Sequence, residues 1–162
     1  MHQSNPDAPV TPLTKETVAS AFNYLRAVEA GDLQTATKLV AAEPRMSALL
    51  AGVAEGIVFA GTSLPGPDDD APTWDSFALE TLGKVFLHAL HLWQQSGPDA
   101  AHGIAQTVNA FFTTILFEPN KLDERDSIAD ALNTYESAAR GQLLLDAKAA
   151  SAAAHPVGNT AV

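Results

Sequence analysis

The sequence contains no cysteine in its 162 residues. This absence excludes a disulfide scaffold, a cysteine nucleophile, a zinc site built on thiolates and a cysteine-bound iron–sulfur cluster. The length suits one ordinary domain, since domains commonly run to about 100–150 residues. A chain of this size buries enough surface to fold without a metal or a covalent cross-link.

Charge is scarce and has mainly one sign. Charged residues make up 17% of the chain, below the typical ~25%, and 9 basic against 19 acidic side chains give a formal charge of −10. Nonspecific binding to nucleic acid or to anionic lipid depends on clustered Lys and Arg, so we expect neither direct nucleic-acid binding nor membrane binding. A surface with few charges exposes more small and apolar groups, which favours association with another protein.

Motifs for nucleophilic catalysis and phosphate binding are absent. The sequence has no Gly-x-Ser-x-Gly, no Ser-x-x-Lys, no Gly-x-x-x-x-Gly-Lys and no dinucleotide-binding glycine fingerprint. The run Asp68, Asp69 and Asp70 lacks the alternate spacing and the closing glutamate of an EF-hand calcium loop. We therefore assign no catalytic residue and no cofactor.

The histidines are the residues best suited to metal binding. His88 and His91 lie three residues apart in a helical pattern, so their rings can face one ion, with Glu80 or His102 as a further ligand. Zinc-protease and di-iron motifs are missing, however. A His-dependent metalloprotein or enzyme is therefore an alternative hypothesis, and the simpler interpretation places these histidines at the rim of the core. We assign no metal site.

The two ends of the sequence predict flexible tails. Residues 1–12 contain three prolines and lack the features of a secretory signal, while 148–162 are alanine and small polar residues. We expect tails at 1–12 and 148–162 around a helical domain at 13–147. No window holds the ~18 uninterrupted apolar residues of a transmembrane helix. These features predict a soluble, cytoplasmic protein, and the alanine-rich, lysine-poor composition is typical of bacteria with GC-rich genomes.

Apolar residues recur at helical spacing through most of the chain. The stripes predict helices from Thr14 to Gly31, Leu33 to about Ala42, Met46 to Val58, Trp74 to Gln95, Pro98 to Glu118, and Asp123 or Asp126 to about Ala147. Thr14, Asp32 and Thr73 are suited to N-caps, and Gly31 to a left-handed helix end. The fold class predicted is all-α: a single-domain bundle of five to six helices with a Pro/Asp-rich loop at residues 61–73.

Two features of these stripes bear on packing. Gly52 and Gly56 lie four residues apart in one helix, which predicts either a close crossing with a neighbouring helix or a ligand against the backbone. In the segment from Trp74 to Gln95, apolar residues cover well over half of the circumference. So wide a stripe predicts a central helix packed on several sides, or one that also meets a second subunit.

The leading functional hypothesis is a non-enzymatic, self-associating interaction protein: an adaptor, regulator or immunity-like factor that binds a protein partner or forms a homodimer. The wide stripe, the acidic loop and the triplet Leu143 to Leu145, which cannot all face one direction, motivate it. The predicted interface residues are Leu79, Leu87, Leu90, Leu144, Leu145, Asp68, Asp69 and Asp70.

The alternative hypothesis is a bundle that binds a small apolar ligand between its helices. The residues predicted to line its pocket are Phe77, Phe86, Trp93, Phe111 and Phe112. The position of the aromatic rings distinguishes the two hypotheses, because rings packed solidly in the core leave no space for a ligand.

Overall fold

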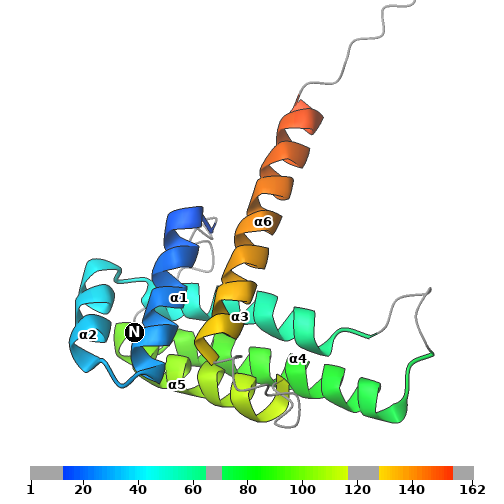
Figure 1. The fold of residues 1–162 in the computed structure, drawn as a ribbon, viewed down its shortest axis with the longest axis horizontal. Helices are drawn as coiled ribbons and strands as arrows, with labels where there is room; N and C mark the ends of the chain where they lie inside the picture. Colours follow the sequence, from blue (N-terminus) through cyan, green and yellow to red (C-terminus); the bar gives the residue numbers. More distant parts are fainter. Residues whose placement is uncertain (1–12, 65–70, 117–127, 155–162) are drawn as a thin grey trace, which may run out of the picture.

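The computed structural model describes residues 13–64, 71–116 and 128–154, and all of its regular structure in these ranges is helical. Helices α1 to α3 span Lys15–Glu29, Leu33–Ala42 and Met46–Thr62; α4 spans Trp74–Gln94; a 3₁₀ turn, η1, spans Pro98–Ala100; α5 spans Ala101–Phe111; a π-helical turn, η2, spans Phe112–Leu116; and α6 spans Ile128–Ala154. The predicted all-α bundle is confirmed (Figure 1).

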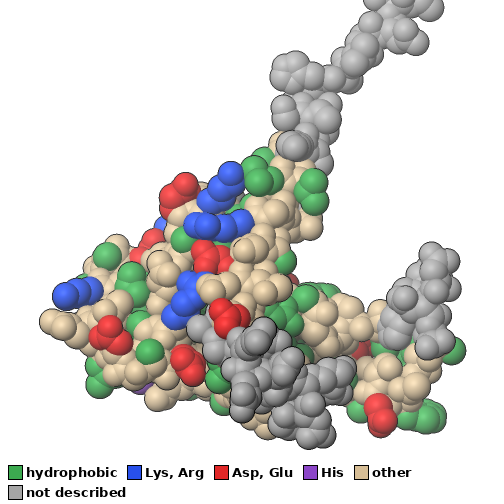
Figure 2. All heavy atoms as spheres, in the orientation of Figure 1, with side chains coloured by type: hydrophobic (Ala, Val, Ile, Leu, Met, Phe, Trp, Pro, Cys, Tyr) green, Lys and Arg blue, Asp and Glu red, His purple; other side chains and the backbone are tan. Residues whose placement is uncertain are grey.

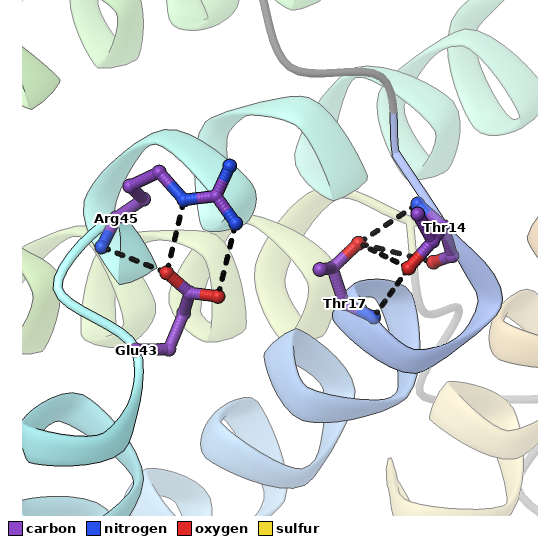
Figure 3. Close-up of polar contacts among 4 residues, drawn as sticks. All are labelled: Thr14, Thr17, Glu43 and Arg45. Atoms are coloured by element: carbon purple, nitrogen blue, oxygen red, sulfur yellow. Dashed lines mark hydrogen bonds and ion pairs between the residues drawn. The ribbon is translucent and has the colours of Figure 1, made fainter.

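Local sequence signals set the first helices. Thr14 and Thr17 form a capping box, in which the Thr17 amide donates to the Thr14 hydroxyl at 3.3 Å and the Thr14 amide to the Thr17 hydroxyl at 2.9 Å (Figure 3). Gly31 adopts φ +70° after α1, and the Asp32 carboxylate accepts from the Thr35 amide at 3.0 Å. The contacts at Gly31 and Asp32 close the tight α1–α2 hairpin that the sequence predicts.

An ion pair spans Pro44 in the connection from α2 to α3, alongside a backbone hydrogen bond from the Met46 amide to the Glu43 carbonyl at 3.0 Å. The Glu43 carboxylate accepts from Arg45 Nε at 3.1 Å, from Arg45 Nη2 at 3.2 Å and from the Arg45 backbone amide at 3.1 Å (Figure 3). The hydrogen bond from the Arg45 side chain holds the pKa of Glu43 below its usual value. Arg45 occupies the N-cap position of α3.

The core lies between α1, α3 and α5. Its largest fully buried side chains belong mainly to these helices: Val18, Phe22, Leu25, Met46, Leu50 and Ile104, together with Leu90, Phe112 and Leu132 from elsewhere in the chain. The expectation that the Trp74–Gln95 segment forms the central helix is wrong. Only Gly83 and Leu90 of α4 are buried, because α4 packs mainly on α3 and leaves its other side open. In Figure 1, α3 and α4 run along one side of the molecule.

The glycine positions correct a second expectation. A Cβ added at Gly56 would meet nothing within 4 Å, and one at Gly52 would make ordinary contact with Leu13 at 3.5 Å. The predicted close helix crossing at these residues is therefore wrong. The tight crossing of α3 and α4 lies at Gly83, where an added Cβ would approach the Thr62 hydroxyl to 2.6 Å.

Helix α6 packs against α1 through both apolar and charged groups. Leu132 is buried, and Ile128, Tyr135, Ala139 and Leu143 pack against the core on the predicted face. Arg26 of α1 donates to Asn133 at 2.7 Å and forms an ion pair with Glu136. The second half of α6 projects away from the other helices (Figure 1) and continues to Ala154, through part of the segment predicted to be a tail. Residues 1–12 and 155–162 lie outside the described residues.

Candidate interaction surface

Helix α4 has well-defined ends. At its start, Thr73 and Ser76 form a second capping box, with the Ser76 amide donating to the Thr73 hydroxyl at 3.2 Å, as the sequence predicts for Thr73. At its other end, Gly97 adopts φ +99° and Pro98 begins the next turn. The Ser47 hydroxyl donates to the Gly97 carbonyl at 2.9 Å and ties this end to α3. The orientation of α4 is therefore fixed at a point far from its first turn.

Three close contacts settle which side of α4 faces the body. Gly83 lets α4 approach the side chains of Val58 and Thr62 on α3. On α5, Gly103 leaves space for the Trp93 ring, since an added Cβ would lie 2.5 Å from it. The Phe86 ring stacks on Phe111 with 4.1 Å between centroids. With α3 and α5 on this side, the opposite side of α4 has no neighbour among the described residues.

That opposite side is exposed, and an apolar stripe runs along it beside the exposed polar residues Thr81 and His88. We define the outer face of α4 as Trp74, Ala78, Leu82, Val85, Ala89 and Leu92, all of which are exposed. The exposed fractions are 87% for Trp74, 63% for Val85 and 55% for Leu92. Because a helix turns about 100° per residue, these six positions fall on one stripe along almost the whole of α4.

The charged residues of α4 lie to the sides of this stripe. Glu80 and Lys84 pair with each other at 3.0 Å on the flank next to α3, and Asp75 is on the other flank. The outer face therefore contains no Asp, Glu, Lys or Arg. Figure 2 shows a contrasting distribution over α1 and the adjacent part of α6, where acidic and basic side chains gather.

The residues predicted for an interface lie in three different settings. Leu79 and Leu87 are half-buried between α4 and its neighbours, and Leu90, at 1% exposed, belongs to the core. Leu144 and Leu145 are exposed on α6, as the reasoning on the leucine triplet requires of at least one. Asp68, Asp69 and Asp70 lie outside the described residues. Sequence reasoning missed Leu82, Val85 and Leu92, because only the contacts of α4 with α3 and α5 show which side of the helix stays exposed.

The aromatic residues predicted to line an apolar pocket do not share one cavity. Phe86 and Phe111 are stacked, and Phe112 is buried with its ring edge-on to Tyr135 at 5.5 Å between centroids. Phe77 and Trp93 are exposed on α4. Three of the five rings are thus occupied in packing, Trp93 lies against Gly103 with part of its ring in solvent, and Phe77 is partly exposed.

The histidines do not assemble a metal site within the described ranges. The His91 Nδ1 atom lies 2.8 Å from the Leu87 carbonyl, a contact within its own helix. His88 is exposed. No group of three or more His, Asp or Glu side chains in the described part of the chain could hold a metal ion.

Two hollows on the surface offer weaker candidates. The crevice between α3 and α4, next to Gly83, has a volume of about 20 Å³, room for little more than one water molecule. A hollow of about 540 Å³ lies between the start of α1 and α6, lined by Lys15, Glu16, Arg140 and their neighbours. Arg140 is already 3.4 Å from Glu136, and Glu16 sits beside Lys15, so charges of both signs compete there.

Over the described residues, no individual helix combines the length and hydropathy needed to cross a bilayer, although α2 and α3 meet the criterion as a pair bent by 105°.

Comparison with known proteins adds no assignment. No protein-family model matches the sequence, and no curated protein or solved structure is significantly similar to it.

Proposed function

We propose that this chain is a non-enzymatic protein-interaction module, an adaptor, regulator or immunity-like factor, that contacts its protein partner through the outer face of α4. One observation carries the proposal: a rigidly docked helix presents six exposed apolar positions, without charge, along one side. An apolar surface of this continuity is a common mark of a protein–protein contact in soluble proteins.

The apolar side chains that α4 leaves in water favour association. Full burial of a side chain such as Leu or Val contributes about 1.5–3 kcal/mol relative to exposure. Leu82, Val85 and Leu92 each retain a large exposed fraction, and Trp74 is almost wholly exposed. A partner that covers these four side chains gains the free energy of burying them, which folding of the single chain does not provide. Large aromatic side chains such as Trp74 also dominate the energetics of many interfaces.

The surface also suits binding mechanically. Thr73 caps α4, the Ser47 hydroxyl binds the Gly97 carbonyl at its other end, and Gly83 packs closely on α3. The outer face is therefore ordered before a partner binds. A pre-organised surface loses little conformational entropy on association, so more of the burial energy contributes to affinity.

Site-specific photo-cross-linking in the cells that produce the protein tests this proposal. A benzophenone amino acid replaces Val85, or replaces the exposed Gln34 of α2 in the control. We expect a discrete protein adduct at Val85 that is absent at Gln34. Equal adduct yields at the two positions would contradict the proposal.

A further inference from the structure

We propose that the occupant of the outer face is the same helix of a second copy, packed antiparallel across a two-fold axis that passes beside Val85. This inference rests on the proposed function, because it names the partner of that surface. It is carried by three properties of the outer face: its spacing, its lack of charge and the order of its large and small residues.

The spacing indicates that the occupant is a helix. Ala78, Leu82, Val85, Ala89 and Leu92 are separated by four, three, four and three residues, the alternation of positions a and d in a heptad. Two helices with such seams pack at a crossing angle of about 20°. Among the described helices, α1, α3 and α5 bury their large apolar stripes in the core, whereas α4 leaves this seam exposed. A second α4 therefore supplies the matching seam.

The lack of charge favours a copy over a basic partner. The chain carries a formal charge of −10, so two copies repel each other through most of their surfaces. The outer face of α4 is a long stripe on which no like charges meet. A basic partner would gain nothing there, because the stripe offers no carboxylate to pair with its Lys or Arg.

The order of residue sizes selects the antiparallel arrangement. Ala78 and Leu92 lie seven residues before and after Val85, while Leu82 and Ala89 lie three before and four after it. With the axis beside Val85, Ala78 of one copy faces Leu92 of the other, and Leu82 lies within one residue of the position opposite Ala89, so large and small side chains interdigitate. A parallel pair in register would place alanine against alanine and leave gaps. An isologous contact of this kind is the commonest form of symmetric dimer.

The size of the contact indicates reversible association. Helix α4 has 21 residues and is therefore about 30 Å long. One face of such a helix provides a contact near the lower end of the specific range, about 1,200 Å² in total. We expect a dimer that dissociates on dilution.

Disulfide cross-linking tests the geometry, and the cysteine-free sequence makes every introduced thiol unique. The variants are Val85→Cys, Ala78→Cys and Leu92→Cys, with Gln34→Cys as an exposed control on α2. A disulfide needs Cα atoms within about 4.4–6.8 Å, and residues seven positions from the axis lie about 20 Å from their own mates.

We expect Val85→Cys to form a disulfide-linked dimer under mild oxidation. Ala78→Cys and Leu92→Cys should each form no intermolecular disulfide alone and should cross-link when mixed together. Self-cross-linking of Ala78→Cys and of Leu92→Cys would indicate a parallel pair and overturn the arrangement. If Val85→Cys alone, and the mixture of Ala78→Cys with Leu92→Cys, gave no more disulfide-linked dimer than Gln34→Cys, the self-pairing would be overturned.

Salt dependence distinguishes the failure of this inference from the failure of the proposed function. Self-association should strengthen with added salt, which screens the mutual repulsion of two acidic molecules. Weakening with salt would contradict self-pairing. A photo-adduct at Val85 with twice the mass of the chain supports the second copy, whereas an adduct with a different protein leaves the proposed function intact and overturns this inference. Absence of any photo-adduct at Val85 would contradict both the proposed function and this inference.

Discussion

Two glycine-to-alanine substitutions, at Gly83 and Gly56, should change stability in opposite directions. Both glycines lie inside helices, and alanine improves helix propensity by up to about 1 kcal/mol at either position. At Gly56 the new methyl group meets nothing within 4 Å, so Gly56→Ala should stabilise the fold by about 0.5–1 kcal/mol. This variant is the matched control.

At Gly83 the new methyl group would lie 2.6 Å from the Thr62 hydroxyl oxygen and 2.8 Å from a Val58 methyl. Neither side chain can turn away easily: both are β-branched and buried, and the Thr62 hydroxyl donates to the Val58 carbonyl at 2.8 Å. Overpacking of this kind costs about 1–3 kcal/mol, which exceeds the gain in helix propensity.

Gly83→Ala should therefore lower the free energy of unfolding by about 1–2 kcal/mol, measured by urea denaturation followed by circular dichroism. The two variants should differ in midpoint well beyond the error of the assay. If Gly83→Ala stabilised the protein as much as Gly56→Ala, α4 would not be docked on α3 through Gly83. The assignment of the outer face would then be wrong.

Three further predictions concern the rest of the fold. Glu136→Gln removes the anionic partner in the ion pair between α6 and α1 and should destabilise the fold by about 1–3 kcal/mol in denaturant titrations; an unchanged midpoint would contradict it. Hydrogen bonds from the Thr35 hydroxyl and amide lower the pKa of Asp32, so its contribution to stability is present above pH 3.8 and lost as pH falls through the lower folded value. The melting temperature of Asp32→Ala should accordingly approach that of the wild type in acid, and a constant difference would refute the cap. Burial raises the pKa of Tyr24 and Tyr135, the two tyrosines of the chain, so the ultraviolet absorbance of the native protein should show both ionising above pH 10, with stability lost as pH rises through their folded values. Ionisation at pH 10 in the folded state would contradict their burial.

Local signals explain the features that the sequence predicts well. The caps at Thr14, Asp32 and Thr73 depend on residues within three positions of each helix start, and all three are confirmed. The left-handed glycine at Gly31 is equally local. The face of α6 that carries Leu132 follows from periodicity alone. Helix ends and helix faces can be predicted because their physical causes lie close together in the sequence.

Features that depend on distant residues could not be predicted. Apolar coverage of α4 shows how much surface could be buried, but only the positions of α3 and α5 show how much is buried. Gly61 lies close to Leu116, and Gly83 lies close to Thr62 and Val58. No local pattern in the sequence indicates either contact. The ion pair between Arg26 and Glu136 spans more than a hundred residues. The outer face of α4 could be defined only after these contacts were known.

The central claim is that the outer face of α4 is covered by a second copy in solution. Light scattering coupled to size-exclusion chromatography, at tens of micromolar protein, measures the mass directly. The wild type should have twice the chain mass of 17.0 kDa, and Val85→Glu, which places a carboxylate at the two-fold axis, should have the mass of a single chain. A wild-type mass of 17.0 kDa at every concentration, with no difference from Val85→Glu, would contradict the claim.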